Sequence, residues 1–384
     1  MIPEVADLLD EAVRAGTLPA YAACVIHRGQ PLHASSGGEI EGGPSTLATW
    51  FDLASLTKPL ATGLAALRLA GQGRLDLDAP VARHLPGFEQ AGKAALRPCD
   101  LLDHSSGLPA WRPYFRGVTP SDASALRPPP SLDFARARAQ IAAAVDAEPL
   151  ERAPGVATLY SDVGFLALGR LVEAVACESL PRFVQREVFE RLGIRNLAFF
   201  DLAAAGVPAG RPIAATGSTR PRPPAAGQET ALEGLPIVAV GARPGEVDDD
   251  NAYACGGVAG HAGLFGTTAA VAKLGQLFLE ELEGAARLAP ERIARRFEQP
   301  ANGRERPLAW DRPSAKGSSL GTKLGRGPRG AIGHLGFTGC SLWIDLDERL
   351  VAVLCTNRVL ANRAPGEFQQ LRALFHDTVA LAIL

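Results

Sequence analysis

The sequence predicts an α+β fold, in which an antiparallel β-sheet is flanked by helices and an inserted, mainly helical subdomain lies to one side. Three observations favour this class. One hairpin pattern stands near the start of the chain and another near its end, helical periodicity fills the long region between them, and a last helical pattern follows the second hairpin. We expect the two hairpins to build one sheet, which makes the domain discontinuous in sequence.

Helical periodicity predicts one helix at each end of the chain. The first sixteen residues lack both the cationic start and the continuous apolar segment of a secretory signal, so we expect this helix to belong to the mature fold. The apolar stripes consist of Val5, Leu8, Leu9 and Val13 in the first helix and of Phe368, Leu371, Phe375 and Val379 in the last.

Two pairs of short apolar runs predict the hairpins. Residues 20–26 and 32–35 flank a turn that contains Gly29. Residues 341–345 and 350–356 flank a polar turn. Because one pair precedes the helical region and the other follows it, the two chain ends are expected to meet in the sheet.

The same pattern divides a single catalytic-sized domain into two parts. The predicted sheet subdomain comprises about residues 1–60 and 250–384, and the predicted helical subdomain about residues 61–249. Residues 112–131 and 207–250 are rich in proline, glycine or alanine and longer than usual connections, which predicts long surface loops. Such loops either border a site or only cover the surface.

Composition restricts the class of protein. The 39 basic and 41 acidic residues nearly balance, so no electrostatic signal for a nucleic-acid partner exists. No uncharged apolar run is long enough for a membrane span. The six cysteines form no Cys-x-x-Cys pair, which favours reduced thiols and a cytoplasmic location. The seven histidines show no metal-ligand spacing, so we expect no metal and no cofactor. No sequence feature indicates an oligomeric state.

The most specific chemical signal is Ser55 followed by Lys58, the only Ser-x-x-Lys of the chain. Pro59 is tolerated in the first turn of a helix, so a helix is expected to begin close to Ser55. Residues three apart share a helix face, and a neutral amine there can take the proton of the hydroxyl. The alternative is a capping serine with a solvated lysine.

Two further motifs carry candidate chemistry. Tyr160 precedes a predicted helix over 163–176 that Ser161 or Asp162 can cap, so the phenol is held at a fixed place where it can exchange a proton; the alternative is a boundary tyrosine. The stretch 333–340 brings closely spaced glycines to a strand, where backbone N–H groups can bind an oxyanion; the alternative is a simple bulge.

In this order the three motifs resemble the signature of serine hydrolases of the class C β-lactamase and penicillin-binding-protein superfamily: Ser-x-x-Lys, Tyr-x-Asn, and Lys-Thr-Gly or His-x-Gly. The resemblance covers most of the chain. It implies a β-lactamase/transpeptidase-like fold with a cleft between its two parts, and a small ester or amide substrate. Further matching stretches are residues 101–109, 256–265 and 354–358.

The resemblance also implies roles. Ser55 is the expected acylated nucleophile, Lys58 its general base or proton relay, and Tyr160 the second base. Backbone N–H groups of Ser55 and Phe337 are the expected oxyanion donors, and the expected supporting and substrate-binding residues are Asp162, His334, Gly336 and Phe337.

Two positions depart from the β-lactamase pattern. Asp162 stands where Asn is usual; a carboxylate cannot donate to a substrate amide and favours the ammonium form of Lys58, so we hypothesise that Tyr160 is the principal base. His334 stands where Lys is usual and is mostly neutral at pH 7. Both changes favour a less charged acyl substrate. Arg358 or Arg363 could restore a cation.

The leading interpretation is therefore a carboxylesterase. The alternatives are a D-amino-acid-specific amidase or peptidase, a β-lactamase-like hydrolase, and a catalytically silent binding protein of the same fold. Structural roles are expected for His104, His261 and the strand cysteine Cys340. Three loop aromatics either form one wall of an acyl pocket or pack onto their own domain: Trp111, Tyr114 and Phe115.

Overall fold

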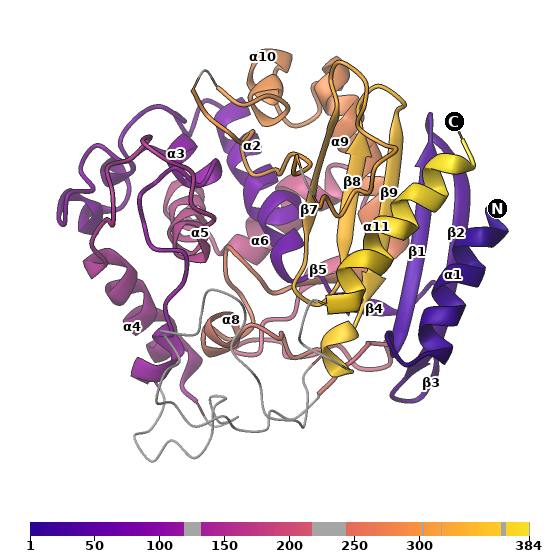
Figure 1. The fold of residues 1–384 in the computed structure, drawn as a ribbon. Helices are drawn as coiled ribbons and strands as arrows, with labels where there is room; N and C mark the ends of the chain where they lie inside the picture. Colours follow the sequence, from indigo (N-terminus) through magenta and orange to yellow (C-terminus); the bar gives the residue numbers. More distant parts are fainter. Residues whose placement is uncertain (119–131, 217–242, 302, 316, 362–365, 384) are drawn as a thin grey trace.

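The computed structural model describes residues 1–118, 132–216, 243–301, 303–315, 317–361 and 366–383 (Figure 1). Its α-helices are α1 (Pro3–Arg14), α2 (Leu64–Gly71), α3 (Pro98–Leu102), α4 (Phe134–Ala147), α5 (Asp162–Ala176), α6 (Leu180–Val184), α8 (Asp250–Ala254), α9 (Thr268–Glu280), α10 (Glu291–Ala294) and α11 (Gly366–Leu381). Its strands are β1 (Ala20–His27), β2 (Gln30–Ile40), β3 (Gly43–Pro44), β4 (Trp50–Asp52), β5 (Leu197–Phe199), β6 (Leu264–Thr267), β7 (Ala331–Leu335), β8 (Ser341–Asp345) and β9 (Leu350–Thr356).

Six strands form one antiparallel sheet in the order β3-β2-β1-β9-β8-β7. Both predicted hairpins are present, β1 with β2 and β8 with β9. The first turns at Arg28 and Gly29, whose φ angles of 49° and 78° lie in the region that glycine adopts without strain. The two ends of the chain meet at the centre of the sheet, because β1 pairs with β9 and places Tyr21 opposite Thr356. The predicted α+β class is confirmed.

The two faces of this sheet contact separate apolar cores, because side chains alternate along each strand. In β1, Ala22 and Cys24 belong to the larger core, which includes α9 and the helices beside the sheet. Ala23 and Val25 belong to the smaller core beneath α1 and α11. Figure 1 shows these two terminal helices over the same face. The predicted apolar stripes contribute to the smaller core through Val5, Leu9, Phe368, Phe375 and Val379.

A second, three-stranded sheet in the order β4-β6-β5 supports the segment that carries Ser55. Its edge strand β4 ends at Asp52, three residues before the serine. β5 lies inside the range predicted as the helical subdomain, yet it pairs with β6 outside that range. The division into two subdomains stays a prediction.

Helix α5 brings the helical part against the sheet part. Gly169 of α5 lies so close to Gly260 that a Cβ on Gly169 would be 2.9 Å from the Cα of Gly260. Only glycine permits this approach. It fixes the segment before β6 against the helix that begins after Tyr160, and thereby brings two predicted motifs together.

The described parts of the predicted long loops pack onto the helical part. Tyr114 donates a hydrogen bond from its hydroxyl to Glu148 at 2.7 Å, and Phe115 is buried against Ile141 of α4. These contacts favour packing of the loop aromatics onto their own domain. Residues 119–131 and 217–242 of these loops lie outside the described residues.

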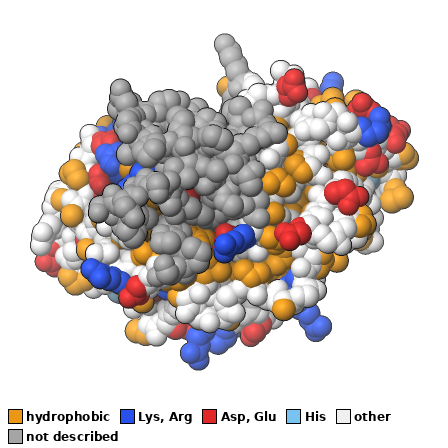
Figure 2. Space-filling view, turned by 90° about the horizontal axis from the view of Figure 1, so that it is seen from below, with side chains coloured by type: hydrophobic (Ala, Val, Ile, Leu, Met, Phe, Trp, Pro, Cys, Tyr) orange, Lys and Arg blue, Asp and Glu red, His pale blue; other side chains and the backbone are white. Residues whose placement is uncertain are grey.

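None of the described helices combines the length and hydropathy needed to cross a bilayer. On the face shown in Figure 2, acidic and basic side chains of the described residues are interspersed. This distribution agrees with the near balance of 39 basic and 41 acidic residues.

Candidate active site

β4 leads into a segment that we call the Ser55 turn, residues 52–58. Ala54 has a φ of 47°, a left-handed conformation that costs a non-glycine residue about 1–2 kcal/mol, and Ser55 follows in a 3₁₀ turn. A helix begins close to Ser55, as predicted, but π-helical geometry spans Lys58–Gly63 and the regular helix α2 begins only at Leu64. Pro59 explains the difference, since it has no N–H for the usual bond to the carbonyl of Ser55.

The Ser55 turn brings the predicted hydroxyl and amine together. Lys58 Nζ donates to Ser55 Oγ at 2.9 Å and to the carbonyl oxygen of His261 at 3.2 Å, and it pairs with Asp162 Oδ1 at 2.7 Å. Lys58 is fully buried, so the alternative of a solvated lysine is wrong. Ser55 is only half-buried and the Asp162 side chain is 20% exposed, so solvent reaches both residues.

The protonation state of Lys58 follows from these contacts. Burial opposes its charge, but the negative charge of Asp162, with a contribution from Tyr160, outweighs burial and raises the pKa of Lys58 above its ordinary value. The amine is therefore an ammonium ion in the resting protein. This is the effect that the sequence predicts for a carboxylate at position 162.

Tyr160 is fixed from both sides at the start of α5. Ser161 caps the helix, since its Oγ accepts the N–H of Gly164 at 2.9 Å. The N–H of Ser161 donates to His104 Nδ1 at 3.0 Å, and the His104 ring lies against the Tyr160 ring with centroids 4.4 Å apart. Burial lowers the pKa of His104 well below its ordinary value, so this histidine is a neutral support for the tyrosine.

The phenol of Tyr160 lies beside Lys58. Lys58 Nζ is 4.9 Å from the Tyr160 ring centroid, so the ammonium group lies over the phenol ring. Burial raises the pKa of Tyr160, although the charge of Lys58 acts in the opposite direction. Both groups carry their protons at rest, so the tyrosine is held as an acid.

The ring of His334, in β7, also lies beside Tyr160, with ring centroids 5.9 Å apart. Its Nδ1 is 3.0 Å from the carbonyl oxygen of Leu335; because a carbonyl only accepts, Nδ1 carries the proton. Burial lowers the pKa of His334 to about 4. The side chain is therefore neutral at pH 7, as the sequence predicts.

The turn after β7 packs against the Ser55 turn. Thr338 Oγ1 donates to the carbonyl oxygen of Asp52 at 2.7 Å. A Cβ on Gly336 would lie 2.7 Å from another carbonyl oxygen of the Ser55 turn, which explains the glycine. Phe337 lies between these two contacts in sequence. The role of the Ser55 and Phe337 N–H groups as oxyanion donors stays a prediction.

Arg358 is one of the two arginines that could restore a cation. It contacts the turn after β7. Its Nη2 donates to the carbonyl oxygen of Phe337 at 2.8 Å, and its guanidinium lies 5.3 Å from the ring centroids of both Phe337 and Phe368. The residue is 6% exposed. Arg363 lies outside the described residues.

Two charged residues near Tyr160 escape prediction from the sequence. Arg306 forms an ion pair with Asp311, and its guanidinium carbon lies 5.4 Å from the Tyr160 ring centroid. Asp311 is fixed to β7 by reciprocal backbone hydrogen bonds of 2.8 and 3.0 Å with Gly333. The Arg306 side chain is 27% exposed. No local motif surrounds either residue, so the sequence offers no signal for them.

The residues assigned structural roles have structural contacts. His261 Nε2 is 2.8 Å from Asp249 Oδ1, and its carbonyl oxygen is the acceptor for Lys58. Cys340 is buried, and its Sγ lies 3.5 Å from the carbonyl oxygen of Asp52. Within the described part of the chain, no three His, Cys, Asp or Glu side chains converge in a way that could hold a metal ion.

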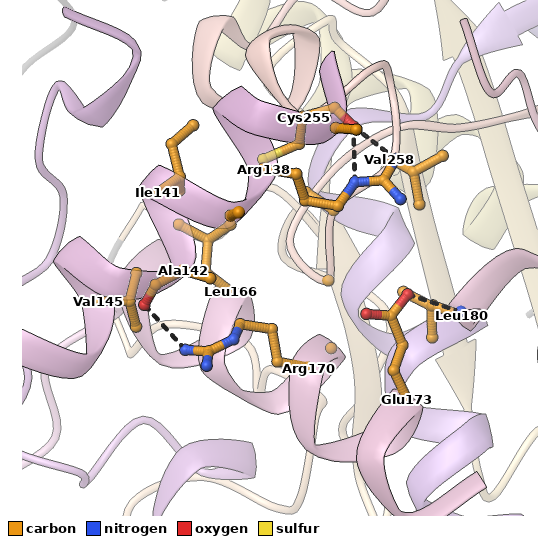
Figure 3. A pocket seen from close by; sticks show the side chains of 15 residues that line it. Arg138, Ile141, Ala142, Val145, Leu166, Arg170, Glu173, Leu180, Cys255 and Val258 are labelled. Carbon is orange, nitrogen blue, oxygen red and sulfur yellow. Dashed lines mark hydrogen bonds between the residues drawn. The ribbon is translucent and has the colours of Figure 1, made fainter. Parts of the chain in front are cut away.

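A separate cavity of about 300 Å³ lies between α4, α5 and residues 255–260 (Figure 3). Its lining is largely apolar. Its charged side chains, Arg138, Arg170 and Glu173, are hydrogen-bonded to backbone groups of neighbouring residues. None of the predicted site residues is among its described lining residues, so this cavity is not the site around Ser55.

A family model described as "Beta-lactamase" matches residues 5–374. The chain belongs to the β-lactamase family. The predicted resemblance is thereby confirmed, and the family includes hydrolases of small esters, amides or peptides.

Two curated relatives and one solved structure refine the comparison. The chain is 35% identical over 245 residues to the putative D-alanyl-D-alanine carboxypeptidase of Escherichia coli, which covers 61% of this chain and 52% of that protein. It is 31% identical over 339 residues to the N-acetylmuramyl-L-alanine amidase of Bacillus subtilis, and this match covers 84% of this chain and 71% of the amidase. The chain thus spans about half the length of the first relative.

The structure of a family VIII carboxylesterase superposes with a TM-score of 0.69 at 20% identity, covering 100% of this chain and 97% of the esterase. At this identity the likeness concerns the fold alone.

Proposed function

We propose that this protein is a serine amidase or peptidase that cleaves an acyl–amino acid bond through an ester on Ser55. The observation that carries the proposal is the 2.9 Å contact between Ser55 and Lys58 beside the protonated phenol of Tyr160. The names of the curated relatives, a carboxypeptidase and an amidase, support the amide substrate. The sequence alone favours an ester substrate, and we reverse that order.

The chemistry takes two steps. Ser55 Oγ attacks the carbonyl carbon, and its proton passes to the pair formed by Lys58 and Tyr160, which accepts it after losing one of its own protons. The C–N bond breaks, the nitrogen takes a proton from Tyr160, and the amine departs. Water then attacks the Ser55 ester, its proton passes to Tyr160, and Ser55 regains a proton as the carboxylic acid leaves.

The state of Tyr160 explains why an amide suits this site. An amide nitrogen is a poor leaving group until it gains a proton, whereas the alkoxide of an activated ester departs more readily. Burial keeps the phenol protonated, and Lys58 holds it in place. The site therefore supplies the acid that amide cleavage needs.

One observation favours an ester as the second candidate. His334 is neutral where the β-lactamase pattern has a lysine, so the position offers no cation to a substrate carboxylate. An uncharged acyl ester would not need one. A silent binding protein is a poorer match, because Ser55, Lys58 and Tyr160 are all present and in contact.

The test begins with a fluorophosphonate and intact-mass measurement. We expect one adduct on Ser55 and none on Ser55→Ala. The protein is then assayed with N-acetyl-D-alanyl-D-alanine, N-acetylmuramyl-L-alanine, p-nitrophenyl acetate and a chromogenic cephalosporin. We expect at least one of the two amides to be hydrolysed with a rate abolished in Ser55→Ala.

The outcomes separate the candidates. Rapid ester turnover without turnover of either amide would contradict the proposal and favour a carboxylesterase. Hydrolysis of the cephalosporin alone would favour a β-lactamase. No adduct on Ser55 would favour a binding protein.

A further inference from the structure

Asp52 is a fully buried carboxyl group at the start of the Ser55 turn. Its Oδ1 accepts the N–H of Ala54 at 2.8 Å, and its Oδ2 accepts the N–H of Asp248 at 2.7 Å. Its backbone carbonyl accepts from Thr338 Oγ1 at 2.7 Å. One residue therefore joins the three segments that surround Ser55.

The bond from Ala54 holds a strained backbone. Ala54 has a φ of 47°, which a non-glycine residue adopts only where its surroundings enforce it. An aspartate that accepts the N–H two residues onward forms a local turn of the kind that stabilises such a conformation. Since Ala54 directly precedes Ser55, the hydrogen bond from the Ala54 N–H to Asp52 fixes the backbone direction at Ser55.

The hydrogen bond from the Asp248 N–H connects Asp52 to the segment that contacts Lys58. Asp249, the next residue, lies 2.8 Å from His261 Nε2, and the carbonyl oxygen of His261 accepts from Lys58 at 3.2 Å. Asp52 is thus connected to Ser55 through the backbone. It is connected to the Lys58 ammonium group through the contacts of Asp248, Asp249 and His261. Loss of either bond would loosen the Ser55–Lys58 geometry.

We propose that Asp52 is a positioning residue that sets the geometry of Ser55 against Lys58, and that it does so fully only as a carboxylate. Both of its oxygens face N–H donors, so a proton on either oxygen would oppose one donor and break one of the two bonds. The inference rests on the proposed role of Ser55 as nucleophile but not on the nature of the leaving group.

Asp52 changes its protonation state within a pH range that experiments can reach. Burial raises the pKa of Asp52 to about 7, against the effect of the two N–H donors. The titratable groups that face Asp52 within the described residues are Asp248, Asp249 and Cys340. The two aspartates oppose its ionisation further, so the carboxyl titrates near neutral pH and Ser55 is better positioned above pH 7 than below it.

The experiment measures the rate of fluorophosphonate labelling of Ser55 by intact mass between pH 5.5 and 9. We expect the unaltered protein to show a rise centred near pH 7, followed by a second rise from the Lys58–Tyr160 pair. Asp52→Asn removes the first rise and labels about 10- to 100-fold more slowly at pH 8, because its NH₂ group opposes one of the N–H donors. In a steady-state assay the loss falls on kcat rather than on KM.

A matched control separates positioning from folding. Asp345 is also buried and accepts backbone N–H groups, from Gly325, Asp347 and Glu348, but it lies at the end of β8 away from the site. Asp345→Asn is expected to keep the labelling rate and both rises. Equal effects of the two substitutions, or a labelling rate of Asp52→Asn equal to that of the unaltered protein, would overturn the proposal.

A second variant, Asp162→Asn, keeps the proposal testable if Asp52→Asn fails to fold. Asp162→Asn is expected to move the second rise and to leave the rise near pH 7 in place. The absence of any rise near pH 7 in both the unaltered protein and Asp162→Asn would overturn the proposal. Because the label reports on Ser55 itself, labelling that follows this pattern without amide turnover would contradict the amidase assignment and support the role of Asp52.

Discussion

At the scale of single residues, Asp162 controls the protonation of the pair formed by Lys58 and Tyr160. Its carboxylate lies 2.7 Å from Lys58 and raises the pKa of that ammonium group against the effect of burial. A base must therefore be generated by loss of a proton before Ser55 can be activated. We expect kcat/KM to rise with pH above neutrality until the pair has lost one proton.

Replacement of Asp162 by Asn tests this account. Without the negative charge the pKa of Lys58 falls, so the basic rise of kcat/KM moves to lower pH by about 1 unit or more. The measurement is a pH profile of p-nitrophenyl acetate hydrolysis from pH 6 to 10. The control Asp377→Asn, at a half-buried position of α11 whose carboxylate accepts the N–H of Thr322, should leave the profile in place. An unmoved rise in Asp162→Asn would show that Asp162 does not control the pair.

Tyr160→Phe tests the hypothesis that the phenol is the principal proton carrier. The ring and its contact with His104 remain, but the proton exchange is lost. We expect the rate of Ser55 acylation to fall by about 10²- to 10³-fold, measured by stopped-flow release of p-nitrophenol. Acylation as fast as in the unaltered protein would refute the hypothesis and leave Lys58 as the base.

Arg306 is the described guanidinium that contacts the Tyr160 ring, and it is partly exposed, whereas Arg358 is turned toward Phe337. We expect Arg306→Gln to lower the preference for N-acetyl-D-alanyl-D-alanine over its C-terminal carboxamide by about tenfold, because a charge-assisted hydrogen bond to the carboxylate is lost. The ratio of the two kcat/KM values measures this preference. The exposed Arg292→Gln serves as the matched control, and an unchanged ratio in Arg306→Gln would remove Arg306 from substrate recognition.

At the scale of elements, the Ser55 turn links stability to pH. The pKa of Asp52 is raised to about 7 in the folded protein, above its value of about 3.9 in an unfolded chain. The stability that this group contributes is fully present below about pH 4 and is lost as the pH rises through 7, with a slope of at most about 1.4 kcal/mol per pH unit. Urea unfolding of the unaltered protein and Asp52→Asn between pH 4 and 8 should differ by this slope; parallel curves would contradict it.

The elements that the sequence predicts well are those defined by local pattern. The bounds of β8 and β9 coincide with the predicted runs 341–345 and 350–356, because each is an apolar run closed by a polar turn. Ser161 is recognisable as a cap for the same reason. The π-helical start of the helix after Ser55 depends on how Pro59 packs within the fold, which no local pattern records.

The site is predictable only in part. Ser55, Lys58 and Tyr160 stand in motifs with fixed spacing, and the structure brings them together. Arg306 and Asp311 reach Tyr160 from a segment without secondary structure of its own, through contacts between residues far apart in sequence. Such contacts follow from the packing of β7 and leave no trace in the local sequence.

At the scale of the whole molecule, the two cores separate stability from catalysis. The smaller core beneath α1 and α11 lies on the face of the sheet opposite α9 and contains no predicted site residue among its buried members. Damage to this core should lower the population of folded protein without altering the chemistry of the folded molecules.

Phe375→Ala tests this separation. Phe375 is fully buried in the smaller core, so its truncation should cost about 3–5 kcal/mol of unfolding free energy. Leu374→Ala, at a position 51% exposed on the same helix, should change stability by no more than about 0.5 kcal/mol. Denaturation gives the stability, and active-site titration gives kcat per folded molecule, which we expect to be unchanged in both. A lower kcat per titrated site in Phe375→Ala would show that the smaller core also affects catalysis.

The pairing of β1 with β9 governs when a growing chain can become an enzyme. β1 and Ser55 are synthesised long before β9, whose Thr356 lies opposite Tyr21, and β7 is synthesised only shortly before β9. Until then one edge of β1 lacks its partner and exposes unpaired backbone groups. Polypeptides that end before β9 should therefore be inert as well as prone to aggregate, and activity should appear only after β9 has been translated.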